Sequence, residues 1–207
     1  MIWITYSSPI VLILAIICGG YYYRWLNKSY RFIYSYIIVC LIIDVICRCL
    51  FFLSLNNIVL MLYLSLAEVI IFLKFYTNIT NKKKASIILS FIGGIYILSE
   101  IILIDHNDIT NYQPYSKIVS SFLIVLMALT YFLEQLKKET AMMNLYLNSI
   151  ILIYFALNMV LLLPINFLID ENSELVFYVW RIYLFTTVLF YANLTYLIWK
   201  NGRTQKQ

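Results

Sequence analysis

Asp44 and Arg48 lie four residues apart in the apolar stretch CLIIDVICRCLFF, residues 40–52. A spacing of four places two side chains on one face of an α-helix, where a carboxylate and a guanidinium can pair. Charges inside an apolar helix suit ion or proton handling, ligand binding or a structural ion pair. Further acids and bases interrupt other apolar stretches in the same way: Glu68, Glu100, Lys117 and Arg181. The chemistry open to these charges depends on what the apolar stretches form.

The composition of the chain is that of a membrane protein. Of its 207 residues, 63% are hydrophobic and 12% are charged, whereas soluble domains have roughly 45–50% and about 25%. A membrane-spanning helix needs about 20 mostly apolar residues. We therefore predict an all-α, single-domain bundle of seven transmembrane helices with no soluble domain, its spans at about 3–22, 32–54, 57–78, 85–104, 114–134, 144–169 and 175–199.

The basic residues between these spans predict the orientation. They fall in alternate connectors and in the C-terminal tail: Arg24, Lys28, Arg31, Lys82, Lys83, Lys84, Lys137, Lys138, Lys200, Arg203 and Lys206. Because basic loops stay on the cytoplasmic side, we expect the N-terminus outside and the C-terminus in the cytoplasm, in a bacterial inner membrane. The basic residues form short tracts rather than one soluble face, so no nucleic-acid partner is expected. The first span has no basic residue before it and no cleavage site, so it should remain as a helix.

The charges within the spans should face inward. A charge left facing lipid at the centre of a helix costs about 2.5–3.5 kcal/mol. Uncharged polar residues extend the same pattern along the later spans. The predicted site is a polar cavity open to the outside, formed by Asp44, Arg48, Glu68, Tyr96, Glu100, Lys117, Tyr154, Asn158, Arg181 and Asn193. Interhelical bonds that only hold the bundle together are the alternative interpretation, and the sequence leaves both open.

Motifs for enzymatic chemistry are missing from the sequence. His106 is the single histidine and lies in an acidic connector, which is weak support for a metal site. Cys47 and Cys49 lack the two-residue spacer of redox motifs. No P-loop, GxSxG, HExxH or GxGxxG sequence occurs. We therefore predict a non-enzymatic protein without a metal or cofactor.

Three stretches resemble a group of small seven-helix inner-membrane proteins of Bacteroidota: residues 63–78, 148–163 and 177–200. The matching positions are Glu68, Tyr154, Phe155, Asn158 and Trp180. Arg181 stands where the group has a histidine shortly after that tryptophan, so the sequence departs from the group there. The resemblance implies a sensory or signalling membrane module that works with a partner such as a histidine kinase.

These observations favour a receptor-like protein. An outer ligand or membrane partner would engage the polar half, and a signalling partner would read the cytoplasmic face, formed by Arg24, Lys28, Lys82, Lys83, Lys84, Lys137 and Lys138. A small solute or ion transporter is the second interpretation, although sugar carriers of the SWEET type have more prolines in their spans. A structural subunit of a larger membrane complex is the third, and a homo-oligomer stays open.

Overall fold

The structure of the chain is a computed structural model, which describes residues 2–53, 57–80, 83–103, 115–136, 144–168 and 173–207. The described residues form seven α-helices, each with a stretch long and apolar enough to cross a membrane. Their bounds are α1 (Ile2–Tyr22), α2 (Lys28–Phe52), α3 (Ile58–Ile79), α4 (Lys83–Leu103), α5 (Ser116–Leu136), α6 (Leu145–Leu168) and α7 (Ser173–Lys206), with a 3₁₀ turn, η1 (Tyr23–Trp25), after α1. The predicted seven-helix membrane bundle is confirmed.

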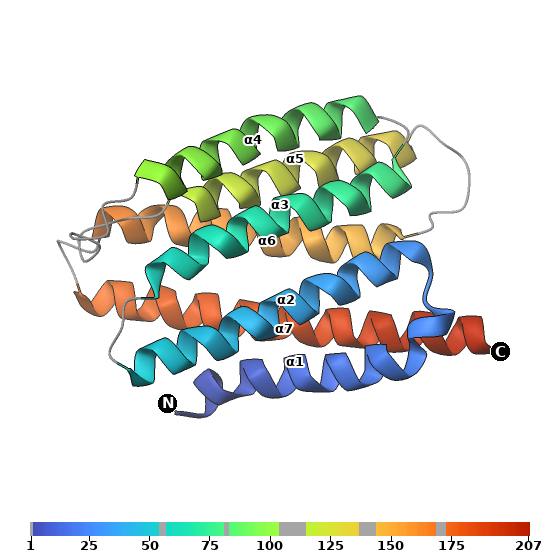
Figure 1. Cartoon of the computed structure of the whole chain (residues 1–207), viewed down its shortest axis with the longest axis horizontal. Coiled ribbons are helices and arrows are strands. Elements are labelled where there is room, and N and C mark those ends of the chain that lie inside the picture. The colour runs from blue at the N-terminus through green and yellow to red at the C-terminus, as the bar shows by residue number, and fades with distance from the viewer. Residues whose placement is uncertain (1, 54–56, 81–82, 104–114, 137–143, 169–172) are drawn as a thin grey trace.

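The helices run alternately in opposite directions along one bundle axis (Figure 1). α1 packs between α2 and α7, and α6 packs between α5 and α7. α3 contacts α2, α4 and α5, whereas α4 lies at the edge of the bundle against α3 and α5. α3 therefore connects the α1–α2 side of the bundle to the α5–α6 side.

The last helix is longer than predicted. α7 continues to Lys206 instead of ending near residue 199, and its 34 residues extend about 51 Å, beyond the roughly 30 Å of a hydrocarbon core. Contacts with the end of α1 hold this extension: the Lys206 amine donates to the Tyr21 hydroxyl at 3.0 Å. Gly202 also packs directly on Tyr22. α2 likewise starts earlier than predicted, at Lys28.

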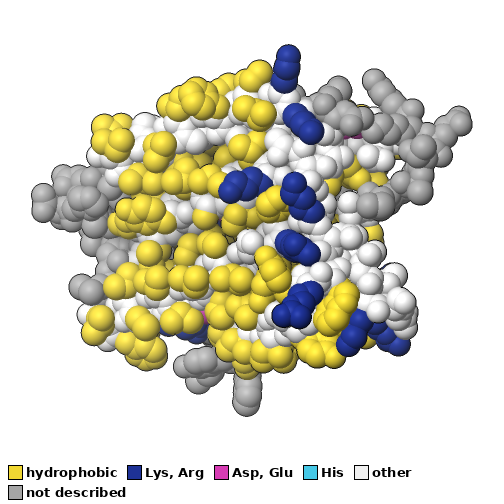
Figure 2. Space-filling view, turned by 45° about the vertical axis from the view of Figure 1, so that its right-hand side comes forward, with side chains coloured by type: hydrophobic (Ala, Val, Ile, Leu, Met, Phe, Trp, Pro, Cys, Tyr) yellow, Lys and Arg dark blue, Asp and Glu magenta, His cyan; other side chains and the backbone are white. Residues whose placement is uncertain are grey.

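One end of the bundle carries most of the described basic side chains, and we call it the basic end. Its members are Arg24, Lys28, Arg31, Lys83, Lys84, Lys200, Arg203 and Lys206. Figure 2 shows Lys and Arg side chains in a band beside a broad apolar surface. Trp25 and Trp199 lie at the same end and are each 38% exposed, as expected for anchors at a membrane interface. The predicted face residues Lys82, Lys137 and Lys138 lie outside the described residues.

Aromatic rings fill the middle of the bundle where α2, α3, α6 and α7 meet. The ring of Phe72 lies 5.0 Å from that of Phe155 and 5.2 Å from that of Tyr36. Phe190 of α7 completes the group, 6.0 Å from Phe155 and 6.2 Å from Tyr36. Edge-on packing of such rings contributes about 0.5–1.5 kcal/mol per pair beyond the burial of area. These rings form an apolar layer next to the buried charged residue Glu68, which contacts Tyr36.

Candidate functional site

A buried ion pair joins α3 and α5. Glu68 lies in the middle of α3 and is fully buried, and Lys117 is the second residue of α5 and is 5% exposed. The Lys117 amine donates to Glu68 Oε1. The sequence identified both residues as candidates, but it did not show that they are partners.

Two further side chains complete the surroundings of the Glu68 carboxylate. The Tyr36 hydroxyl of α2 donates to Oε1 at 3.3 Å, and the Ser120 hydroxyl of α5 donates to Oε2 at 3.0 Å. An ion removed from water needs both a counter-charge and hydrogen bonds to offset its lost hydration. Both carboxylate oxygens of Glu68 are thus partnered, and three helices converge on one acid.

Buried polar atoms without partners lie at the same depth. The Asn148 amide donates to the Ala128 carbonyl at 3.2 Å. α5 and α6 are antiparallel, so ten residues forward from Asn148 in α6 corresponds to ten residues back from Ala128 in α5. Asn158 is therefore level with residue 118, next to Lys117. Asn158 is 0% exposed, and neither polar atom of its side chain makes a hydrogen bond of normal geometry among the described residues. The hydroxyl oxygens of Ser116 and Ser121 are also buried and also make no such hydrogen bond among the described residues.

α6 and α7 contribute tyrosines to this region. Tyr154 is 4% exposed, its ring stacks on Phe190 at 3.8 Å, and its hydroxyl lies 3.4 Å from that of Thr187. Tyr183 of α7 lies close enough to Lys117 to interact electrostatically. We call the group that these helices bring together the polar core: Tyr36, Glu68, Lys117, Ser120, Tyr154 and Asn158.

The other two acids lie in different surroundings. Asp44 and Arg48 form the predicted pair on one face of α2, with contacts of 2.7 and 3.2 Å. Their side chains are 24% and 28% exposed, so this pair is not enclosed as Glu68 is. Glu100 accepts a hydrogen bond from the Tyr115 backbone N–H at 2.8 Å. Of the three acids, only Glu68 belongs to the polar core.

Two of the predicted cavity residues do not lie in the polar core. Tyr96 is 41% exposed on the outer side of α4. The Asn193 amide donates to the Leu189 carbonyl of its own helix at 2.8 Å, and Asn193 lines an open groove between α6 and α7. A polar side chain can meet its hydrogen-bonding needs on its own helix, so polarity alone does not fix its direction. Arg181, another candidate, lies over the Phe177 ring at 4.0 Å.

Polar bonds also tie the last turns of α3 to three other helices at the basic end. The Tyr76 hydroxyl donates to Asn148 of α6 at 2.9 Å, and the Asn78 amide donates to Ser29 of α2 at 3.0 Å. The Thr80 hydroxyl donates to Glu134 of α5. These bonds and the Tyr36 and Ser120 contacts could not be predicted from the sequence, because hydroxyl side chains in apolar helices are common and carry no sign of their partners.

The described residues include no group of three or more His, Cys, Asp and Glu side chains that could hold a metal ion. Glu68, Lys117 and the hydroxyl groups around them can instead bind a small polar solute or an ion, or transfer a proton. No known protein family, curated protein or solved structure gives a significant match to the chain. The resemblance to the Bacteroidota group therefore stays a prediction.

Replacing Asn158 with leucine should raise the thermal stability of the protein. A buried polar group without a good hydrogen bond costs about 1–3 kcal/mol, and leucine has the same number and branching of side-chain heavy atoms without that cost. We expect an increase in Tm of at least about 2–4 °C, which is about 1 kcal/mol for a protein of this size. The measurement is thermal unfolding in detergent, with Asn193→Leu as the matched control because that amide is already bonded. A lower Tm for Asn158→Leu would show that the amide has partners in the membrane-embedded protein.

Proposed function

We propose that the chain is a seven-helix membrane sensor whose switching element is the Glu68–Lys117 pair. A small polar solute or an ion reaches the polar core from the end opposite the basic end. The rearranged helices are then read at the basic end, which faces the cytoplasm of a bacterium and binds a signalling partner. One observation carries the proposal: an enclosed ion pair lies beside buried polar atoms that make no hydrogen bond of normal geometry among the described residues.

A buried ion pair suits a switch because its energy terms nearly cancel. The desolvation of two charges offsets much of their attraction, so a ligand that supplies a new partner to either charge can separate them. A carboxylate-bearing solute would compete for Lys117, and an amine or a proton would compete for Glu68. Asn158, Ser116 and Ser121 would supply further hydrogen bonds to that ligand.

α3 offers a path from the polar core to the basic end. It carries Glu68 at its middle and, about two to three helical turns later, the bonds of Tyr76, Asn78 and Thr80 to α6, α2 and α5. A packed helix with discrete polar partners shifts between distinct arrangements rather than bending continuously. A movement of α3 at Glu68 would therefore change the contacts that order the basic end.

Neutralising the pair tests the switch. We expect Glu68→Gln/Lys117→Gln to change the distance between spin labels at positions 28 and 83 by about 2–5 Å, within the range of helix shifts in switching proteins. Both positions are exposed at the basic end. The protein is measured in lipid nanodiscs with its four native cysteines replaced. Asp44→Asn is the control, because it breaks an ion pair outside the polar core. An unchanged distance, or an equal change in the control, contradicts the proposal.

An ion-coupled transporter is the second candidate, because mid-membrane charges also serve transport. Liposomes that contain the purified protein distinguish the two. A sensor shows no net uptake of amino acids, organic acids or protons above that of empty liposomes. Uptake that the doubly neutral variant abolishes would favour the transporter and contradict the sensor.

A further inference from the structure

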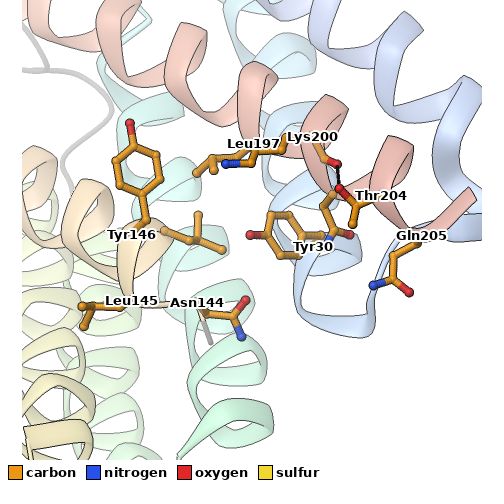
Figure 3. Close-up of a pocket in the computed structure, with 10 residues that line it drawn as sticks. Tyr30, Asn144, Leu145, Tyr146, Leu197, Lys200, Thr204 and Gln205 are labelled. Atoms are coloured by element: carbon orange, nitrogen blue, oxygen red, sulfur yellow. Dashed lines mark hydrogen bonds between the residues drawn. The ribbon is translucent and has the colours of Figure 1, made fainter. Parts of the chain in front are cut away.

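A pocket of about 260 Å³ opens at the basic end, between the start of α6, the last turns of α7 and the start of α2 (Figure 3). Its polar lining includes Tyr30, Asn144, Tyr146, Lys200, Thr204 and Gln205. Figure 3 shows Lys200 extended across the pocket, with Tyr30 and Asn144 on the facing side. The volume is slightly below the roughly 300 Å³ at which pockets for drug-sized ligands begin, so the pocket suits a small polar group.

The lining has the chemistry of an anion site. Lys200 supplies a positive charge, the amides of Asn144 and Gln205 supply N–H donors, and none of the described residues that line the pocket is acidic. The pocket also lies at the first turn of α6, where unbonded backbone N–H groups and the helix dipole favour an anion. Asn144 has φ 68°, a left-handed conformation that turns the chain sharply into α6.

We expect the pocket to lie at the depth of the lipid headgroups, because aromatic residues of the kind found at membrane interfaces surround it. Trp199 is one residue before Lys200 in α7, and Trp25 lies at the same end of the bundle. Tyr146, which lines the pocket, is 58% exposed. Tryptophan and tyrosine gather where the hydrocarbon core meets the headgroups. An anion that enters from the side of the membrane would therefore be a headgroup phosphate.

We propose that this pocket binds a phosphate group, supplied by an anionic phospholipid of the surrounding leaflet. Lys200 pairs with the phosphate, the amides hydrogen-bond its oxygens, and the acyl chains lie along the apolar surface of α6 and α7. The proposal does not depend on the sensor function, because it uses neither the polar core nor the orientation of the bundle.

Lipid binding by three single variants tests the pocket. The purified protein is titrated with phosphatidylglycerol or phosphatidylcholine in mild detergent, and bound lipid is counted by native mass spectrometry. Lys200→Gln should weaken the binding of phosphatidylglycerol about five-fold, the contribution of one basic residue near an anionic surface. Arg203→Gln removes the same charge at the same end but outside the lining, and should change binding less than two-fold. Gln205→Trp narrows the pocket without changing charge, and should also weaken binding.

Free phosphate and glycerol 3-phosphate form a separate arm of the titration. Lys200-dependent binding of phosphatidylglycerol, with no binding of these soluble ions at equal concentration, supports the lipid source. Tight binding of the soluble ions that displaces the lipid overturns the lipid source and retains the phosphate site. If Lys200→Gln and Arg203→Gln weaken phosphatidylglycerol binding equally and Gln205→Trp does not weaken it, the lipid is attracted diffusely to the basic end. That result would overturn the proposed binding site. Comparable binding of phosphatidylcholine would overturn it as well.

Discussion

Replacing Lys117 with methionine is expected to lower the free energy of unfolding by about 3–5 kcal/mol, because the change leaves the Glu68 carboxylate buried without its counter-charge. The two remaining donors, Tyr36 and Ser120, are neutral hydroxyl groups. They cannot offset the loss of hydration of a full negative charge. Methionine matches the length of the lysine stem, so the expected loss reflects charge rather than a cavity.

Neutralising both partners should recover most of that loss. A buried pair replaced by uncharged groups of similar size is often as stable as the original pair. We therefore expect Glu68→Gln/Lys117→Met to lie within about 1.5 kcal/mol of the unchanged protein. Because either single variant leaves one buried charge unpaired, at about 3–5 kcal/mol, the coupling energy from the double-mutant cycle should exceed about 3 kcal/mol, the top of the usual range. The measurement is reversible denaturation in mixed micelles, followed by the near-ultraviolet signal of the aromatic core.

Arg48→Met is the matched control for this cycle, since it also removes one base from an acid within a span. Its partner Asp44 is 24% exposed, so it is not enclosed by the bundle, and a charge within a span costs at most about 2.5–3.5 kcal/mol, at the helix centre. We expect a smaller loss than that for Lys117→Met. If Lys117→Met costs no more than Arg48→Met, Glu68 has access to water, and the enclosed pair is not the centre of the site.

The apolar pattern was sufficient to predict the helices, and local spacing was sufficient to predict one ion pair. Spans were recognisable because a helix in lipid must satisfy its own backbone, so length and hydrophobicity define it. Asp44 and Arg48 could be paired because both lie on one helix at a spacing of four. The end of α7 was missed because the polar residues after Trp199 look like a tail. Contacts with Tyr21 and Tyr22, which are distant in the sequence, keep them helical.

The partner of Glu68 could not be predicted because it depends on which helices are neighbours. Glu68 and Lys117 are separated by 49 residues, and α4, the helix between them in the sequence, packs outside both α3 and α5. Topology prediction orders helices across the membrane but does not place them around a bundle. The same reason explains Tyr96 and Asn193: polar residues were assigned to the interior by type, whereas the direction of each side chain follows from helix rotation.

Gly19→Ala should be among the most damaging small substitutions in the protein. A Cβ at Gly19 would lie 2.3 and 2.4 Å from two ring carbons of Tyr34, across the contact between α1 and α2. The Tyr34 side chain is 9% exposed, and its hydroxyl donates to the Ile16 carbonyl at 3.2 Å, so the ring has little room to move. Overpacking of this kind costs about 1–3 kcal/mol. We expect a loss in that range.

Gly20→Ala is the matched control, because it makes the same backbone change one residue later in the same helix. Its nearest neighbour is the Tyr34 hydroxyl oxygen at 3.4 Å, which is an ordinary contact. We expect Gly20→Ala to leave the stability unchanged or to raise it slightly, since alanine favours a helix over glycine. The difference between the two variants therefore isolates the contact with the ring. Denaturation of both variants in an unchanged and a Tyr34→Ala background measures it, because removal of the ring should relieve most of the Gly19→Ala loss. Equal losses for the two glycines, or a loss at Gly19 that persists without the ring, would show that α1 and α2 are not held together by this contact.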